Sequence, residues 1–485
     1  MATAFSGPGR DAIMAVKGVV FLVLAAISVS CADSELGLDT DPTRVIALSR
    51  QLSQEFNGAY PLSPVPNGNV RKVELNASEF ESGVRPPYLS RVWGYNQRVP
   101  GPVIRMALGE TLEVKLTNNL PQPTSIHWHG VRVPNSMDGV PGLTQKAVPL
   151  GKSFVYRFTP KDAGTFWFHP HFRSSEQVEK GLHGVLIVED PADPPYSAEL
   201  VWMLDDWLLE KDGSIYDQFV THHDLAHDGR WGNFLTVNGQ FRPVFMVNPG
   251  DRIRIRMVNV ANGRVFLPVI PGMESRVIMV DGMAVAEPFL LGNFDLAPGN
   301  RLDVDLVVPA NSAGRTFAVE NRFSRQPSLL AFLQVDIQKA KDTPSFDLPR
   351  AGHFPDWKEA EGIPVHHEFI LDAERGGIHG ISWTIDGRIW PRSQVLELWA
   401  GQFYRLRFTN RSSRLHPMHL HGQFFRLLSR NERDTDERFW RDTILVGPRE
   451  SVDIGLVPTD LGLWANHCHV LEHAEAGMMT AVRVN

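Results

Sequence analysis

The stretch His467-Cys468-His469, followed by His473 and Met478, contains five side chains that can each bind a metal ion. In an extended segment, successive side chains point to opposite faces. His467 and His469 would then face one side, and Cys468 would face the other. A cysteine, histidines and a weakly bound methionine form the ligand set of a blue copper electron-transfer site. The stretch therefore predicts a cysteine site that is joined through a few backbone atoms to the histidines of a second site.

Three further short runs place histidines close together, in a chain that has 18 histidines. They read His127-Trp128-His129-Gly130, His169-Pro170-His171 and His416-Pro417-Met418-His419-Leu420-His421. The same alternation puts the two histidines of each His-X-His pair on one face. His416 is three residues from His419 and should face the other way, so we assign it, together with His473, to the Cys468 site. Eight histidines in four pairs remain, and they would suit about three copper ions.

Neither a purely structural role nor zinc binding accounts well for these histidines. A single His-X-His pair is often an ordinary core or surface feature, but four such clusters beside a suitably spaced cysteine and methionine are hard to account for in this way. Structural zinc sites use four ligands, often paired cysteines, whereas this chain has only Cys31 and Cys468. Copper is therefore the favoured metal.

The four runs resemble the copper-binding motifs of the multicopper oxidases, the laccase-like blue copper enzymes, and they follow the order that this family uses. The resemblance extends from about Val70 to Asn485, lacks no ligand position, and implies four copper ions. The implied type 1 ligands are Cys468, His416 and His473, with Met478 as the axial ligand, and the implied type 2 ligands are His127 and His419. The implied ligands of the type 3 pair are His129, His169, His171, His421, His467 and His469.

The resemblance also implies a reaction, that of an oxidoreductase with dioxygen as the acceptor. A reductant gives up one electron at a time at the type 1 copper, with His473 as the point of electron uptake because its ring edge lines the substrate pocket in laccase-like relatives. The electrons pass through Cys468 to His467 and His469, and dioxygen is reduced to water at the three-copper site. The weak axial ligand Met478 indicates a moderate redox potential.

Proton delivery is assigned to Asp138, which lies nine residues after His129, where relatives have an acid. The alternative is a simple turn aspartate before a glycine. Many relatives also have an acid directly after the residue that matches His473. This chain has Ala474 there, flanked by Glu472 and Glu475 at nearby positions, so the second half of the proton path stays open.

Three classes of function are compatible with these motifs. The first is oxidation of phenols or aromatic amines, and the second is oxidation of Cu(I) or Fe(II) in metal tolerance. The absence of methionine between Gln338 and Leu415 disfavours a thioether site for cuprous ions. The third, a non-enzymatic copper-binding envelope protein, is disfavoured because every ligand is retained. A separate group, His222, His223, Asp224, His227 and Asp228, is either a labile metal site or a solvated loop.

The N-terminus predicts export. Lys17 precedes the apolar run Val19–Val29, which ends in small residues before Cys31, as in a signal peptide. A single anchor helix is the alternative, although the run is short for a membrane span. Cys31 is placed like the acylated cysteine of a lipoprotein and could carry a lipid anchor, whereas Ser28 departs from that pattern. The net charge of −7 argues against nucleic acid as a partner.

Three segments share one strand pattern and indicate a repeated domain. Gly109–Asn118, Gly250–Asn259 and Gly401–Asn410 each begin with glycine, alternate apolar and polar residues, and end in asparagine. Such alternation is typical of a strand with one buried face. Together with the length of 485 residues, it predicts an all-β chain of three consecutive cupredoxin-like Greek-key β-sandwich domains, without long helices.

The predicted boundaries follow from these segments. The second domain has Val265-Phe266-Leu267-Pro268 about where the first has its histidines, so we expect it to hold no copper and to act as a spacer. The predicted parts are a signal peptide or lipoprotein signal at 1–31, an N-terminal extension of uncertain order at 32–69, and domains at 70–192, 193–340 and 341–485.

Overall fold

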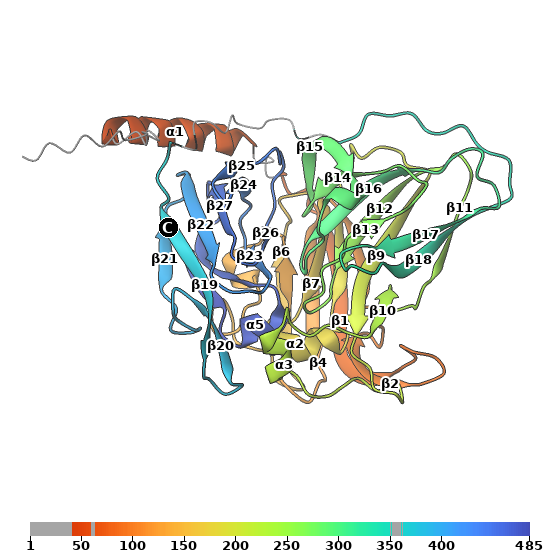
Figure 1. The fold of residues 1–485 in the computed structure, drawn as a ribbon, viewed down its shortest axis with the longest axis horizontal. Coiled ribbons are helices and arrows are strands. Elements are labelled where there is room, and N and C mark those ends of the chain that lie inside the picture. The colour runs from red at the N-terminus through yellow and green to blue at the C-terminus, as the bar shows by residue number, and fades with distance from the viewer. Residues whose placement is uncertain (1–40, 60–63, 350, 352–359, 361) are drawn as a thin grey trace, which may run out of the picture. The chain divides into compact units, whose positions relative to one another are not determined.

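The structure, a computed structural model, describes residues 41–59, 64–349, 351, 360 and 362–485, all within one folded unit, Asp39–Asn485. Three pairs of β-sheets follow one another along this part of the chain (Figure 1). The predicted signal segment with Cys31, and residues 32–40 of the predicted extension, lie outside the described residues. Among the helices of the described part, none is long and apolar enough to cross a membrane.

The first pair of sheets has the strand orders β2-β1-β4-β6 and β3-β8-β7-β5. Its strands are β1 (Val70–Ser82), β2 (Ser90–Tyr95), β3 (Val103–Ala107), β4 (Thr111–Asn118), β5 (His127–His129), β6 (Ser153–Phe158), β7 (Gly164–His169) and β8 (Gly184–Glu189). Two short helices, η1 (Asn135–Met137) and α2 (Ser174–Glu179), lie in its loops.

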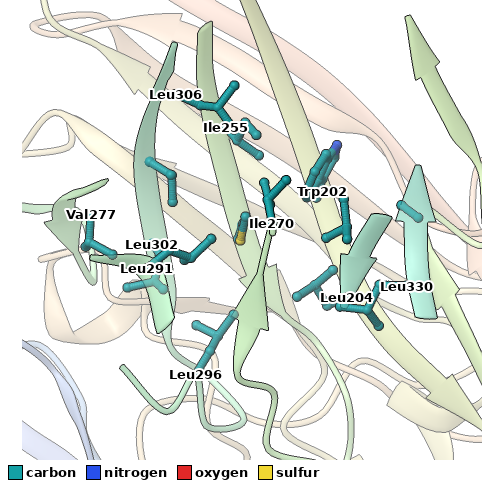
Figure 2. Packing of buried hydrophobic residues seen from close by; sticks show 14 of the residues in the cluster. Trp202, Leu204, Ile255, Ile270, Val277, Leu291, Leu296, Leu302, Leu306 and Leu330 are labelled. Carbon is teal, nitrogen blue, oxygen red and sulfur yellow. The ribbon is translucent and has the colours of Figure 1, made fainter. Parts of the chain in front are cut away.

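The second pair has the strand orders β10-β9-β12-β16-β14-β15 and β11-β18-β17-β13. Its elements are β9 (Ala198–Trp207), α3 (His222–Ala226), β10 (Phe234–Val237), β11 (Val244–Val247), β12 (Arg252–Asn259), β13 (Pro268–Val269), β14 (Ser275–Val280), β15 (Met283–Leu290), η2 (Leu291–Asn293), β16 (Arg301–Val307), β17 (Thr316–Asn321) and β18 (Ser328–Val335). Figure 2 shows the core of this pair, where Trp202, Ile255 and Leu302 belong to one buried apolar cluster.

The third pair has the strand orders β20-β19-β22-β27-β24-β25 and β21-β29-β28-β23-β26. Its elements are β19 (His367–Arg375), β20 (Ile381–Ile385), β21 (Val395–Leu398), β22 (Tyr404–Asn410), β23 (His416–Leu420), β24 (Arg426–Arg430), β25 (Arg433–Asp434), β26 (Thr443–Val446), β27 (Ser451–Leu456), β28 (Gly462–Cys468), α5 (Leu471–Glu475) and β29 (Met479–Val484). The predicted succession of three β-sandwiches is thus confirmed, while the predicted limits of the three domains stay predictions.

The three strands with a shared sequence pattern take equivalent places in their sheets. Each of β4, β12 and β22 pairs in parallel with the first long strand of its sandwich and antiparallel with a later one. The asparagine that ends each strand has the same task, because the side chains of Asn118, Asn259 and Asn410 each accept from a backbone N–H two residues on and donate to two or more backbone carbonyls. The asparagine therefore holds the loop that follows the strand.

Strand β12 departs from the predicted single buried face. Arg254 and Arg256, at positions expected to be exposed, are buried. Both pair with Asp303 of β16, and Arg256 also donates to the hydroxyl of Thr165 in β7 (2.9 Å). The polar face of β12 therefore packs against the first sandwich instead of facing solvent. The buried arginines are paired with a carboxylate there rather than hydrated.

A long helix is present, contrary to the prediction. Helix α1 (Pro42–Ala59) has 18 residues and begins where the Asp41 carboxylate accepts from the backbone N–H of Thr43. Leu52 and Phe56 are fully buried, and the Phe56 ring packs 4.9 Å from that of Phe403. The apolar residues recur every four positions, so this face of α1 covers part of the third sandwich.

Three short helices from the three sandwiches meet near one end of the strands. Helices α2 and α3 both contact α5, and the three labels lie together in Figure 1. Helix α5 begins three residues after Cys468 and carries His473, so the predicted cysteine site lies beside this meeting point.

Candidate metal centres

The cysteine site is assembled from β23, β28 and α5. The Sγ atom of Cys468 lies 3.5 Å from Nδ1 of His416 and 3.9 Å from Nδ1 of His473, and the two Nδ1 atoms are 3.3 Å apart. All three side chains are buried. This triad is the one predicted from the sequence, and its three ligand atoms converge on one point as a metal site requires.

The outer nitrogens of the two imidazoles are held by other groups. Nε2 of His416 is hydrogen-bonded to the hydroxyl of Ser412 (2.9 Å), and Nε2 of His473 donates to the carbonyl of His227 (2.9 Å). These contacts fix each ring so that Nδ1 faces Cys468, as outer partners of metal-bound histidines do. Met478 is also buried, and its carbonyl accepts from the backbone N–H of Cys468 (3.1 Å).

The structure also brings the eight remaining histidines together. Three groups have ligand atoms within reach of one ion: His127, His129 and His169; His127, His419 and His421; and His171, His421 and His467. In the third group, Nε2 of His467 lies 3.0 Å from Nε2 of His421 and 3.3 Å from Nε2 of His171. The ring of His469 completes the cluster, 4.9 Å from that of His129. The first and third sandwiches each contribute four histidines.

Unpartnered nitrogens inside this cluster fit metal ions. Among the described residues, buried ring nitrogens without a hydrogen-bond partner include Nε2 of His127, His169, His419 and His469, and Nδ1 of His129. Nδ1 is held by a backbone carbonyl in four of the cluster histidines. The donors are His127, His169, His419 and His467, and their acceptors are Asp138, Pro170, Asp442 and Cys468 in the same order. Buried polar atoms normally find partners, so nitrogens that converge without one are suited to a metal.

Electrostatics favour the metal-binding forms of these side chains. Burial, followed by repulsion between neighbouring imidazoles, lowers the pKa of His129, His169, His171, His421 and His469 well below the usual 6.5. Burial also lowers the pKa of His467 and of His473 to about 3. The rings are therefore neutral at pH 7, which is the form that binds metals. Burial raises the pKa of the Cys468 thiol, so this group is a thiol until a metal displaces its proton.

Asp138 bridges two parts of the histidine cluster. Its carboxylate lies 3.0 Å from Nδ1 of His421 and 3.2 Å from Nδ1 of His127, and its side chain is 1% exposed. The turn that holds it depends on Gly139, because a Cβ there would lie 1.7 Å from the carbonyl oxygen of Ile126. Asp138 is thus both a turn residue and a neighbour of the cluster, while its role in proton delivery stays a prediction.

A buried charged network on the other side of the cluster was not predicted. Asp442 lies 3.1 Å from Nε2 of His129, and the guanidinium of Arg301 donates to both Asp442 oxygens at 2.9 and 2.7 Å. Although burial disfavours its charged form, Arg301 and His419 hold the pKa of Asp442 below its usual range. Burial and the charge of Asp442 raise the pKa of the neighbouring Asp281. No local pattern marks these residues in the sequence.

Arg301 and Asp281 belong to the middle sandwich, so this domain also contacts the histidine cluster, while its expected lack of copper stays a prediction. Gly299 lies against the cluster, and a Cβ on it would approach Cε1 of His129 to 2.8 Å. The middle sandwich therefore supplies no histidine to the cluster but forms one of its walls.

The acids near Ala474 do not face the eight histidines. Glu472 is buried and accepts from the backbone N–H of Arg230 and from the side chain of Asn262. Glu475 accepts from the backbone N–H of Ser175 (3.3 Å). Both residues connect α5 to neighbouring sandwiches, and the second half of the proton path stays open.

Comparison with known proteins agrees with this arrangement. Family models described as multicopper oxidase match residues 81–193, 198–340 and 363–485. The multicopper oxidase MmcO of Mycobacterium tuberculosis is 30% identical over 421 residues, which cover 80% of this chain and 82% of that protein.

Two solved structures share the fold. A multi-copper oxidase from Pseudomonas thermotolerans is 32% identical, with a TM-score of 0.76, over 86% of this chain and 99% of that one. A multicopper oxidase from Campylobacter jejuni, described as a metallo-oxidase, is 25% identical, with a TM-score of 0.73, over 87% of this chain and 94% of that one. Both likenesses agree with the cupredoxin-like fold expected from the sequence.

Proposed function

Since the chain belongs to the multicopper oxidase family, whose members are oxidoreductases with dioxygen as the acceptor and four copper ions as cofactors, we propose that it oxidises a reductant one electron at a time and reduces dioxygen to water. The observation that carries this proposal is the position of Cys468 between His467 and His469 at the end of β28. The thiol faces His416 and His473, while the two flanking imidazoles face the histidine cluster.

We assign the copper ligands by the family resemblance and by the convergence of the side chains. The proposed type 1 ligands are Cys468, His416, His473 and, as the axial ligand, Met478. The proposed type 2 ligands are His127 and His419. The proposed type 3 ligands are His129, His169, His171, His421, His467 and His469. Unpartnered nitrogens in the cluster and the buried thiol support this assignment.

When bound, the copper ions supply one-electron oxidation at the cysteine site and four-electron reduction of dioxygen at the histidine cluster. Cys468 contributes a covalent path, because only backbone atoms separate it from His467 and His469. The backbone carbonyls of Asp138, Pro170 and Asp442 keep the imidazoles in one tautomer. All of the proposed ligands except the partly exposed His171 are buried, which limits their contact with bulk water.

Asp138 is the proposed proton carrier. Its carboxylate contacts Nδ1 of both His421 and His127, so it can hold a proton next to two proposed ligands. Asp442 has a similar position at His129, but Arg301 keeps it ionised, so it serves to orient rather than to deliver protons.

Phenols or aromatic amines are the first class of reductant that we propose. The absence of methionine between Gln338 and Leu415 supports this class over a thioether-based cuprous oxidase. Oxidation of Cu(I) or Fe(II) is the second candidate. One observation favours it: His473 has no exposed surface, because His227 covers the ring edge that was expected to line an open pocket.

A comparison of reductants tests the proposal. Oxygen uptake by one copper-loaded sample should be followed with a phenol, with Cu(I) and with Fe(II), each without added Cu(II). Uptake with at least one reductant is expected, and the most efficient reductant identifies the class. No uptake by a fully copper-loaded sample with any of the three would contradict the oxidase function.

We further propose that the protein is exported. The charged residue and apolar run before Cys31 support this. A lipid anchor on Cys31 stays a proposal.

A further inference from the structure

The residues Thr221–Asp228, here called the cap segment, cover the cysteine site. The carbonyl of His227 accepts from Nε2 of His473 (2.9 Å), and the carbonyl of Leu225 accepts from the indole of Trp383 (3.1 Å). The Trp383 ring in turn packs 4.2 Å from the His473 ring. A reductant that arrives from solvent therefore meets the cap segment before it meets His473.

The cap segment has a fixed shape. Thr221 and Asp224 form a capping box at the start of α3, with each side chain bonded to the backbone N–H of the other residue. Leu225 is fully buried, and Asp228 accepts from the backbone N–H of Leu415, next to His416. The segment is thus held at both ends and does not need to fold when a reductant binds.

Two histidines stand on the outer face of this segment. The side chain of His223 is 79% exposed, His227 is also exposed, and their rings stack with centroids 4.2 Å apart. His227 follows the last residue of α3 and has an extended backbone, so the stacking of the two rings is what places both histidines on one side of the segment. Nδ1 of His227 donates to the carbonyl of His223 (2.8 Å), which leaves Nε2 of His227 available. Two adjacent imidazoles can supply ligands to one metal ion, and imidazole suits copper and iron.

We propose that His223 and His227 bind a reduced transition-metal ion, Cu(I) or Fe(II), and that the cap segment conducts its electron to His473. His227 connects the two places, because its ring would bind the ion while its own carbonyl is bonded to His473. The inference rests on the proposed oxidase function, which must take up the electron.

The reaction balances without a further reactant. Four ions each lose one electron, which gives four Cu(II) or four Fe(III). The four electrons and four protons from solvent convert one dioxygen into two water molecules. The binding pair uses nitrogen rather than sulfur ligands, so the lack of methionine between Gln338 and Leu415 is no obstacle to it.

Metal binding gives the first test, with the copper-loaded full chain dialysed against Cu(II). The wild-type protein should bind one ion beyond its resident copper, and His223→Ala and His227→Ala should not. His222→Ala is the matched control, because His222 is an exposed neighbour on α3 whose ring lies beside Gly380; it should bind like the wild type. The His227→Ala change keeps the backbone carbonyl that contacts His473.

Kinetics give the second test. The KM for Fe(II) or Cu(I) should rise about tenfold or more in both variants, but not in His222→Ala. Retention of the additional ion by both variants, or an unchanged KM for both metal ions, would overturn the inference. Failure of the oxidase function itself would look different, since the wild-type protein would then take up no oxygen with a phenol or with either ion.

Discussion

The carboxylate of Asp138 lies 3.0 Å from Nδ1 of His421, although 283 positions separate the two residues in the chain. The same carboxylate reaches His127, so one acid touches a histidine from each end of the sequence. Because Asp138 contacts histidines from both halves of the cluster, it is the most informative single residue to replace.

Replacing Asp138 with asparagine should slow dioxygen reduction while copper stays bound. The amide keeps the shape of the side chain but cannot carry the proton. Loss of an outer partner of metal-bound histidines typically costs about 10–100-fold. Steady-state oxygen uptake and copper content measure the two effects. Asp212→Asn is the control, since Asp212 also precedes a glycine in a turn but is exposed. Unchanged turnover would leave Asp138 with its turn role only.

Replacing Cys468 with serine should abolish the intense blue absorption of the copper-loaded protein. Serine has nearly the same volume but supplies no thiolate, so the strong sulfur-to-copper transition of a blue site is lost. Copper content should fall by one ion while the histidine cluster stays loaded. Absorption spectra and metal analysis check both points. A colourless wild-type protein with full copper content would refute the cysteine site.

Copper loading at pH 7 should release one more proton from the wild type than from Cys468→Ser. Burial raises the pKa of this thiol, so its proton is present until copper displaces it. His129 and His473 are already neutral before copper binds, because burial lowers their pKa. Copper affinity of the cysteine site should therefore rise with pH. Titration in weakly buffered solution measures the released protons, and equal release from both proteins would contradict the assignment.

Replacing Arg301 with methionine should strongly destabilise the copper-free protein. The change leaves the Asp442 carboxylate buried without its cation, and breaking a buried ion pair in this way costs about 3–5 kcal/mol. Thermal unfolding of copper-free samples should show a clear fall in Tm. Arg276→Met is the matched control, because the Arg276–Glu274 pair is exposed and its loss should change Tm little. Similar Tm values for both variants would mean that Arg301 has no such role.

Local periodicity in the sequence predicted the grouping of the histidines and the three repeated strands. Alternation along a strand separated His416 from His419 and His421, and the structure places the three side chains in two different sites. The three glycine-to-asparagine segments marked the centres of three sheets. These features depend on residues close together in the sequence, which is why the sequence alone reveals them.

Features that depend on distant residues escaped prediction. Asp442, Arg301 and Asp281 come together only when the second and third sandwiches pack, and no motif joins them. The second buried face of β12 has the same cause, because its arginines meet partners on other strands. The cover over His473 is a main-chain carbonyl, which any residue at position 227 could supply. Helix α1 had a visible period of four, but its partners lie at the far end of the chain.

The division of the histidines between the first and third sandwiches also governs when chemistry can begin. A nascent chain that has grown only through β18 carries four of the eight cluster histidines and none of the cysteine site. Such an unfinished chain, or one truncated before β23, lacks the groups needed to gather the full set of copper ions. Dioxygen reduction is thereby restricted to molecules whose synthesis has reached the last strands. The position of these ligands late in the sequence keeps incomplete chains from assembling the full copper site.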